Sequence, residues 1–301
     1  MINKLSDIFE QLQDGNRVIL SVAAAHDEEV LLAIKEAVEK EIITPILIGY
    51  EDRIIEISKE IGFNLEGIKI IHKDTIEECA ECAVRLVSSK EADFVMKGLL
   101  DTSVILKAVL NKEWGLRTDS LLSHVMIYEI PAYHKLLVTT DGGMNIAPDY
   151  EQKVKILKNA IEATKPLGME NIKVACLAAK EKVNPKMPAT VDARALEEDC
   201  KAGKFGEGVV VEGPLAFDLA ISKEASKVKC FESEVAGDAD ILLMPTIEVG
   251  NGIGKTITYF AGGKSAGVIM GAKAPIVLTS RADSHESKLY SIAYGALIAR
   301  K

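Results

Sequence analysis

Aromatic residues, cysteines and long apolar runs are all scarce in this sequence. Phenylalanine, tyrosine and tryptophan make up 5% of its 301 residues, so we expect an aliphatic core. Its five cysteines are few and odd in number, which argues against a disulfide framework. No run approaches the ~20 apolar residues of a membrane helix, and residues 1–17 lack the apolar segment and basic lead of a signal peptide. We therefore predict a reduced, cytoplasmic protein.

Basic charge is scarce as well. The chain has 36 lysine and arginine residues against 45 aspartate and glutamate residues, which makes a net charge of −9. A protein that binds nucleic acid in bulk needs a basic field to neutralise the phosphates. The composition thus argues against nucleic acid as a partner, and no segment indicates a membrane. A local basic pocket for a small anion is compatible with this charge.

Short β-branched runs alternate with amphipathic segments along the chain. The predicted strands are residues 18–22, 44–48, 68–71, 94–96, 125–129, 136–140, 172–177, 208–211, 241–244, 268–270 and 275–278. The predicted helices include residues 28–39, 75–88, 150–164, 191–202 and 284–299. Strands that alternate with helices of about 10–15 residues indicate βαβ units around mostly parallel sheets. This pattern predicts an α/β fold.

The length predicts two domains, because 301 residues exceed the usual size of a single core. The candidate boundaries are a turn-rich break at residues 139–148 and the glycine pair Gly262-Gly263. We predict a discontinuous first α/β domain of residues 1–138 plus 270–301, and a second α/β domain of residues 139–269. We expect the active site in the cleft between them.

The most informative stretch spans residues 271–287. Its apolar part, residues 274–278, predicts a buried strand that ends in Thr279, Ser280 and Arg281 before a helical pattern begins. In open α/β sheets, ligands bind beyond the carboxyl ends of the strands. A hydroxyl group, a guanidinium group and a helix N-terminus placed there suit a phosphate or another oxyanion.

Other polar residues adjoin predicted strands or this stretch. Lys97 comes directly after the predicted strand at residues 94–96. Thr102 lies in the following turn, where it either caps a helix or contacts a ligand. Ser123 precedes another strand, in a segment that also reads as an ordinary surface loop. His285 follows the predicted oxyanion site and is a candidate substrate contact.

Residues 250–256 read Gly-Asn-Gly-Ile-Gly-Lys-Thr, which is similar to a phosphate-binding loop. The P-loop motif requires a glycine where Val249 stands, and the dinucleotide fingerprint requires one at Ile257. We interpret the segment as a strand-to-helix turn whose backbone N–H groups, with Asn251 and Lys255, face a ligand. The alternative is a glycine-rich turn without a ligand.

No motif predicts a metal site or a serine hydrolase. Cys79 and Cys82 lie in a helical pattern without a second pair or a nearby histidine cluster, so we interpret them as half-buried helix residues. The chain has no Gly-x-Ser-x-Gly elbow.

Several segments in a fixed order carry a family resemblance. They are Met96-Lys-Gly-Leu-Leu-Asp-Thr-Ser103, Leu122-Ser-His124, Asp141-Gly-Gly-Met144, Val211-Glu-Gly-Pro-Leu-Ala-Phe-Asp218, Gly237-Asp-Ala-Asp-Ile241, Gly250-Asn251 with Lys255, and Thr279-Ser-Arg-Ala-Asp283. Together they resemble the phosphate acetyl/butyryl transferase family, most closely its phosphate butyryltransferase branch. The resemblance extends over nearly the whole chain.

The resemblance implies two α/β domains with an interdomain cleft, on a fold similar to the isocitrate/isopropylmalate dehydrogenases. It also implies transfer of a short-chain acyl group between coenzyme A and inorganic phosphate, so that butyryl-CoA and phosphate form butyryl phosphate and CoA. Acyl-CoA and phosphate would be the partners, with coenzyme A as co-substrate and no permanently bound cofactor. Homodimers or larger homo-oligomers are the implied assembly.

Ser280 and Arg281 match the family's serine–arginine pair at the phosphate and acyl-phosphate site, and we predict that both are catalytic. The acetyl branch carries an aspartate seven residues after that serine, proposed as the base for the CoA thiol, where this chain has Ser287. Asp283 and Glu286 are nearby carboxylates, and the resemblance assigns the base to neither. The predicted substrate-binding residues are Lys97, Thr102, Ser123, Asn251, Lys255, Thr279, Asp283 and His285.

Three other functions stay open at this point. The chain is also similar to phosphate acetyltransferases that act on acetyl-CoA. A metal- and NAD-dependent decarboxylating dehydrogenase of similar fold would need clustered aspartates, whereas Asp192, Asp199 and Asp218 are scattered. A non-catalytic acyl-CoA or phosphate sensor is the third. For the transferase we expect direct transfer in a ternary complex, because the chemistry requires no protein nucleophile.

Overall fold

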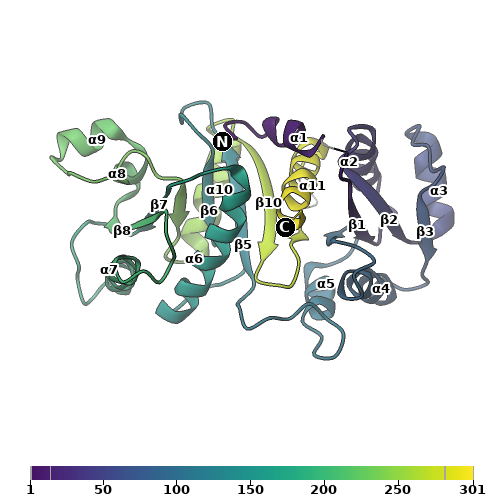
Figure 1. Cartoon of the computed structure of the whole chain (residues 1–301), viewed down its shortest axis with the longest axis horizontal. Coiled ribbons are helices and arrows are strands. Elements are labelled where there is room, and N and C mark those ends of the chain that lie inside the picture. The colour runs from purple at the N-terminus through teal and green to yellow at the C-terminus, as the bar shows by residue number, and fades with distance from the viewer. Residues whose placement is uncertain (1, 14, 281–282, 301) are drawn as a thin grey trace. The chain divides into compact units, whose positions relative to one another are not determined.

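The computed structural model describes residues 2–13, 15–280 and 283–300 (Figure 1). The chain divides into two compact units. We call Ser6–Ser120 with Ala266–Lys301 the terminal unit, because it contains most of both chain ends, and Met1–Leu5 with Leu121–Ser265 the central unit. Each unit is built from both strands and helices, which confirms the predicted α/β fold class.

The sheet of the terminal unit is parallel except at one edge. Its strand order is β3 (Lys69–His72), β2 (Ile43–Gly49), β1 (Val18–Ala23), β4 (Phe94–Lys97), β11 (Ile276–Val277) and β10 (Lys264–Met270). Only β10 runs antiparallel, against β11. The inner strands β1 and β4 are almost entirely buried, as their continuous apolar sequences require for a sheet covered on both faces.

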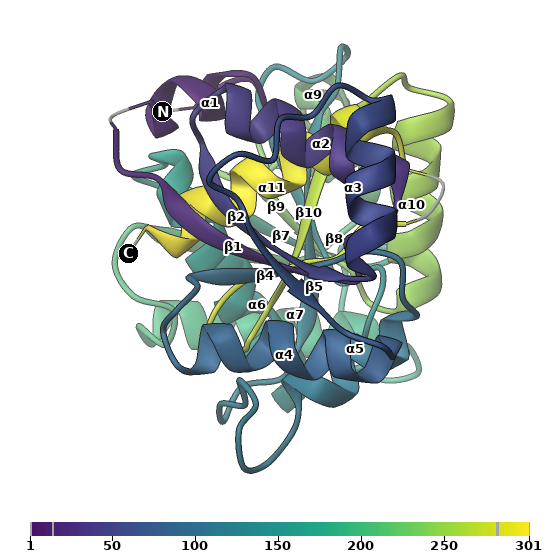
Figure 2. The same ribbon diagram turned by 90° about the vertical axis from the view of Figure 1, so that its right-hand side faces the viewer.

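Helices cover both faces of this sheet. They are α1 (Asp7–Leu12), α2 (Glu28–Glu39), α3 (Glu51–Glu60), α4 (Ile76–Ser88), α5 (Thr102–Val109) and α11 (His285–Ala299). Figure 2 shows α1, α2, α3 and α11 on one face and α4 with α5 on the other. Side-chain caps fix where α2 and α4 begin: Asp27 accepts a hydrogen bond from the N–H of Val30, and Thr75 forms a capping box with Glu78.

The strand order of the terminal unit reverses between β1 and β4. The chain runs from β1 outward to β2 and β3, then returns to form β4 on the other side of β1. The loops after β1 and β4 meet here, because the N–H groups of Gly98 and Leu99 donate to the carbonyls of Ala23 and Ala24 at 2.8 Å. Gly98 is required, since a Cβ there would lie 2.3 Å from the oxygen of Ala24. Such a reversal is where ligands bind in open α/β sheets.

The central unit has a sheet of strand order β5 (Ser123–Glu129), β6 (Leu137–Thr140), β9 (Ile241–Leu243), β7 (Ile172–Leu177) and β8 (Val209–Leu215). β5 and β6 form an antiparallel hairpin, and the other pairs are parallel. Its helices are α6 (Tyr150–Thr164), the 3₁₀ turn η1 (Lys165–Leu167), α7 (Pro188–Lys201), α8 (Phe217–Ile221), α9 (Lys223–Val228) and α10 (Ile247–Tyr259).

The compact units and the predicted domains differ in their boundaries. The sequence assigned residues 121–138 to the first domain, whereas the structure groups them with the central unit. The reason is strand pairing: this segment forms the β5–β6 hairpin, and β6 lies beside β9. The hairpin therefore shares the central sheet and its core.

Within the described ranges, the longest helices have 15 residues, and none is both long and apolar enough to cross a membrane.

Candidate functional site

Two adjacent parallel strands of the terminal unit end at the same edge of the sheet. β4 ends at Lys97, and β11 pairs with it so that Val277 lies opposite Met96. Thr279 and Ser280 follow β11 after one intervening residue, Leu278. The pairing therefore brings a lysine and two hydroxyl residues to the carboxyl edge of the sheet, next to the strand-order reversal.

Lys97 carries a positive charge into this edge. The residue is only 6% exposed, and its Nζ donates to the carbonyls of Gly98 at 3.3 Å and Leu100 at 3.0 Å. Both carbonyls belong to the turn between β4 and α5. The two carbonyl oxygens stabilise the ammonium group at this buried position, and a cation placed here attracts an anion.

After β11, two hydrogen bonds join Ser280 to Asp283, and we call this hydrogen-bonded pair the Ser280–Asp283 turn. The backbone N–H of Ser280 donates to Oδ2 of Asp283 at 2.7 Å, and the N–H of Asp283 donates back to the carbonyl of Ser280 at 3.2 Å. Thr279 is buried and Ser280 is exposed. Asp283 thus holds the turn with its carboxylate. Arg281, the predicted partner of Ser280, lies outside the described residues.

The first turn of α11 follows at once. Oγ of Ser284 accepts a hydrogen bond from the N–H of Ser287 at 3.3 Å and so caps the helix. Ser287, which occupies the position of the acetyl branch's aspartate, lies against this cap, with its Oγ 3.4 Å from that of Ser284. Of the two nearby carboxylates, Asp283 and Glu286, Asp283 accepts a hydrogen bond from the backbone N–H of Ser280 and so holds backbone in place.

His285 and Thr102 begin helices in the terminal unit. His285 is the first residue of α11 and faces α2, where it lines a surface pocket with Leu32, Lys35, Glu36, Glu39 and Lys40. Thr102 is the first residue of α5, next to the N-cap residue Asp101. Their positions at helix N-termini agree with the pattern read from the sequence.

His26 lies at the same edge, and sequence reasoning assigned it no role. It follows β1, its ring packs 4.4 Å from that of Tyr50, and Nδ1 accepts a hydrogen bond from the N–H of Tyr50 at 3.5 Å. Burial lowers the pKa of His26, and the charge of Arg53 adds to this effect, whereas Asp27 opposes it. The only signal in the sequence was its position just after a strand.

In the central unit, a buried carboxylate organises the turn after β6. Asp141 is 3% exposed and accepts hydrogen bonds from the N–H groups of Gly143 at 2.8 Å and Met144 at 2.9 Å. Its other oxygen accepts from Nδ2 of Asn145 at 2.6 Å. The Asp-Gly-Gly-Met segment is therefore a rigid turn at the carboxyl edge of the central sheet.

The predicted strand-to-helix turn at residues 250–256 is wrong, because these residues lie inside α10. The N–H of Gly250 donates to the carbonyl of Thr246 at 3.2 Å and cannot face a ligand. The glycines serve close packing instead. A Cβ on Gly250 would lie 2.7 Å from the carbonyl oxygen of Asp141, and one on Gly254 would lie 2.6 Å from the hydroxyl of Tyr128.

Asn251 and Lys255 lie one turn apart on the exposed surface of α10. Nδ2 of Asn251 donates to the carbonyl of Gly142 at 3.4 Å, so this side chain points toward the turn after β6. The ammonium group of Lys255 lies 5.9 Å from the ring centroid of Tyr259. Both side chains are accessible, although the surrounding backbone is helical.

Ser123 is fully buried at the start of β5. Its Oγ accepts a hydrogen bond from Nδ2 of Asn159 at 2.9 Å, and the same amide donates to the carbonyl of Leu121 at 2.7 Å. In this arrangement Ser123 fixes the start of β5 against α6.

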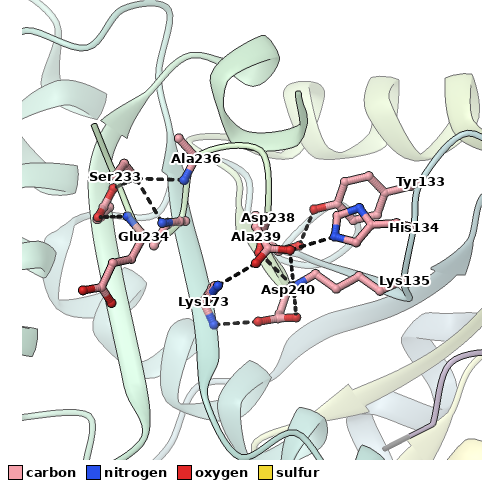
Figure 3. Close-up of polar contacts among 12 residues, drawn as sticks. Tyr133, His134, Lys135, Lys173, Ser233, Glu234, Ala236, Asp238, Ala239 and Asp240 are labelled. Carbon is pink, nitrogen blue, oxygen red and sulfur yellow. Dashed lines mark hydrogen bonds and ion pairs between the residues drawn. The ribbon is translucent and has the colours of Figure 1, made fainter. Parts of the chain in front are cut away.

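The Gly237–Ile241 segment forms a charge cluster before β9, at the amino end of the central sheet's parallel strands (Figure 3). Asp238 pairs with His134 at 2.7 Å and with Lys173 at 2.5 Å. Burial alone would raise the pKa of Asp238, but hydrogen bonds from Lys173 and His134 and the charge of Lys135 outweigh it and hold that pKa well below its usual value. Because ligands bind at the opposite edge of such sheets, we interpret the cluster as structural.

Among the described residues, no three or more His, Cys, Asp or Glu side chains gather as a metal ion would require. The cysteine pair of α4 also has an ordinary environment. Burial raises the pKa of Cys79 to about 11 and also raises that of Cys82. High thiol pKa values are typical of inert helix cysteines.

Comparisons with known proteins agree with each other. A family model described as phosphate acetyl/butaryl transferase matches residues 72–296. A phosphate butyryltransferase of Clostridium acetobutylicum is 44% identical over 299 residues, which covers 99% of each chain. A phosphate acetyltransferase of Thermotoga maritima is 41% identical over 289 residues, covering 96% of this chain and 98% of its own. The crystal structure of a branched-chain phosphotransacylase from Enterococcus faecalis V583 matches with a TM-score of 0.83 and 35% identity, over 94% of this chain and 99% of that one.

Proposed function

Since this chain belongs to the phosphate acetyl/butyryl transferase family, we propose that it is an acyltransferase that converts butyryl-CoA and phosphate into butyryl phosphate and CoA. The butyryl assignment is supported by the 44% sequence identity to a phosphate butyryltransferase, in an alignment that covers 99% of both chains. Coenzyme A is then a co-substrate that binds and leaves in each turnover.

In the structure, the proposal rests on the polar groups at the carboxyl ends of β4 and β11. Lys97 offers a positive charge there, and Ser280, which follows β11, is exposed. The N-terminus of α11 comes directly after that turn and adds its own positive potential. This combination suits inorganic phosphate or the phosphoryl end of an acyl phosphate. We propose Thr279, Asp283 and Thr102 as residues that shape or contact the site.

The reaction needs one new bond and one broken bond. A phosphate oxygen attacks the thioester carbonyl carbon, and a C–O bond forms as the carbonyl oxygen takes the negative charge. The C–S bond then breaks, and the CoA thiolate leaves and takes the proton that the attacking hydrogen phosphate gives up. In this scheme Arg281 holds the phosphate oxygens bidentately, and Ser280 donates to the developing oxyanion. One such donor is worth about 3 kcal/mol in the transition state.

We propose direct transfer in a ternary complex, because phosphate itself is the nucleophile. The protein need not form an acyl-enzyme. Mixing the enzyme with butyryl-CoA alone and measuring its intact mass tests this step. An unchanged mass is expected, whereas accumulation of a butyryl adduct would contradict direct transfer.

Thiol release distinguishes the candidate functions. We expect phosphate-dependent release of CoA from butyryl-CoA without NAD or magnesium. No thiol release, together with magnesium-dependent reduction of NAD by a hydroxy acid, would favour the dehydrogenase. Tight acyl-CoA binding without turnover would favour the sensor. Comparing kcat/KM for acetyl-, propionyl-, butyryl-, valeryl- and isobutyryl-CoA then tests the chain preference. Highest efficiency with acetyl-CoA would replace the butyryl assignment by the acetyl alternative.

Asn251 and Lys255 are proposed as substrate contacts from the central unit, because both are exposed on α10. His285 is proposed as a contact from the start of α11. Ser123 would contribute only indirectly, through the position of β5, since its hydroxyl is buried. Kinetics of single alanine variants test each residue separately.

We also propose a cytoplasmic homodimer or larger homo-oligomer. All five cysteines are free, which suits a reducing compartment. Light scattering on the purified chain measures the assembly, and a monomer at working concentration would contradict it.

A further inference from the structure

Lys288 is a buried lysine for which the family resemblance assigns no role. It is the fourth residue of α11 and only 3% exposed. Its backbone N–H donates to the carbonyl of Ser284, as in a regular helix, at 3.1 Å. Its side chain returns over the first helical turn, and Nζ donates to the backbone carbonyl of Asp283. Long helical side chains point toward the N-terminus in this way.

This contact connects Lys288 to Ser280 through one intermediate. Asp283 binds the N–H of Ser280 with its carboxylate at 2.7 Å, and it donates its own N–H to the carbonyl of Ser280 at 3.2 Å. Lys288 binds the remaining polar backbone group of Asp283. The three residues form a chain of hydrogen bonds that ends on the backbone of the proposed catalytic serine.

The buried position of the Lys288 ammonium group is unfavourable for the stability of the fold. In the described part of the chain, no carboxylate forms an ion pair with its ammonium group. By contrast Lys153, which is 5% exposed, pairs with Asp192 at 2.6 Å. A cation in the first turn also opposes the helix dipole. Burying such a charge is unfavourable unless an anion shares the region.

We propose, on the premise of the acyl-transfer function above, that Lys288 is a positioning residue for the Ser280–Asp283 turn. Through Asp283 it fixes the backbone of Ser280, and its buried charge makes the turn electropositive before phosphate arrives. An anion bound at Ser280 then balances the charge that the protein leaves unpaired there. Lys288 acts on phosphate through the turn and does not touch it.

The test compares three variants of the full-length enzyme. Lys288→Met removes charge and donor, and Lys288→Arg keeps both. Lys153→Met is the matched control, because it removes a buried ammonium group in the central unit. KM for phosphate, KM for butyryl-CoA, kcat and the thermal unfolding midpoint are measured for each. Phosphate binding without acyl-CoA is measured by calorimetry.

We expect Lys288→Met to raise KM and Kd for phosphate at least about tenfold, equivalent to ~1.4 kcal/mol, with KM for butyryl-CoA within about twofold. Lys288→Arg should recover most of the phosphate affinity. Lys153→Met should lower the unfolding midpoint and leave the KM for phosphate unchanged. If Lys288 were purely structural, its replacement would lower the thermal unfolding midpoint without raising KM for phosphate more than KM for butyryl-CoA.

Unchanged phosphate affinity in a folded Lys288→Met enzyme would overturn the proposal. An equal rise of both KM values, or failure of both Lys288→Met and Lys288→Arg to fold at all, would overturn it too, because the lysine would then be structural. The wild-type assay separates this outcome from failure of the proposed function. If wild-type enzyme transfers no acyl group to phosphate, the function fails, whereas normal wild-type turnover with an insensitive Lys288 removes this inference alone.

Discussion

Single side chains at the carboxyl edge of the terminal sheet mainly hold backbone in place. Asp283 closes the turn that carries Ser280, and Lys97 binds carbonyls of the turn after β4. Such groups set the direction of N–H and hydroxyl donors before a ligand binds. Preorganised donors need no rearrangement in the transition state, which is why a small change at one residue can have a large kinetic effect.

Ser280→Ala and Arg281→Ala should each depress kcat/KM for phosphate at least about a hundredfold, because each removes a donor or charge from the reacting phosphate. Steady-state thiol release at varied phosphate measures the effect. Arg194→Ala is the control, since Arg194 pairs with Glu197 on α7 and is not one of the predicted site residues. Near-normal kinetics in Arg281→Ala would remove that residue from the site.

The five thiols should differ strongly in reactivity. Burial raises the pKa of Cys79 to about 11 and raises that of Cys176, whereas Cys230 is exposed. A thiol reacts as the thiolate, so alkylation at pH 8 should modify Cys230 first. Peptide mass mapping after brief treatment with iodoacetamide identifies the site. Cys230→Ser should abolish the fast phase; fast labelling of Cys79 would show that α4 opens readily.

At the scale of elements, α10 shows how glycines set the distance between a helix and its neighbours. Gly250 lies against Asp141 and Gly142, and Gly254 lies against Tyr128. Each contact involves atoms closer than a Cβ would permit. The helix therefore packs tightly on the turn after β6 and on β5, and its glycines are packing residues.

Gly250→Ala and Gly252→Ala should change stability in opposite directions. The added methyl group at residue 250 meets the backbone of Asp141 at 2.7 Å, and overpacking of this kind costs about 1–3 kcal/mol. At residue 252 nothing lies within 4 Å. Alanine in an exposed helix position is better than glycine by about 1 kcal/mol. Urea unfolding of both variants measures the difference, and equal stabilities would contradict the described packing.

At the scale of the whole molecule, both ends of the chain contribute to the terminal unit. α1 packs on α11, and the guanidinium group of Arg300 donates to the carbonyls of Gln11 and Leu12, the latter at 2.7 Å. Near the C-terminus, β11 adds to the sheet formed by β1 to β4, and α11 packs on that sheet. The central unit is held by its own core and by the charge cluster around Asp238.

The Asp238 cluster predicts how stability depends on pH. The folded pKa of Asp238 is lower than its unfolded value, so its contribution is present above about pH 4 and is lost as the pH falls toward the folded pKa. Asp238→Asn should lower the unfolding free energy by about 2 kcal/mol at pH 7. The difference in unfolding free energy between the variant and the wild type should become smaller below pH 4. Urea unfolding from pH 7 to pH 3 measures it, and a constant gap would contradict the role of the charge.

The fold class and most elements followed from local patterns. The predicted helices at residues 28–39 and 150–164 coincide with α2 and α6, because their apolar positions repeat with helical period and polar caps precede them. The predicted helix at residues 191–202 begins earlier, at Pro188, since proline is tolerated in a first turn. Ser280 and Lys97 could be proposed because strand ends are recognisable in sequence.

The amino-acid sequence alone determined the α/β class, the order of the strands along the chain and the family to which the chain belongs. Tertiary structure decided what each polar or small residue does. It placed Gly250 inside a helix, buried Ser123, and aimed the ammonium group of Lys288 at Asp283. The physical reason is the separation along the sequence over which each kind of interaction acts. Periodicity and capping act between residues a few positions apart, whereas packing distances, burial and ion pairs depend on neighbours that only the folded chain brings together.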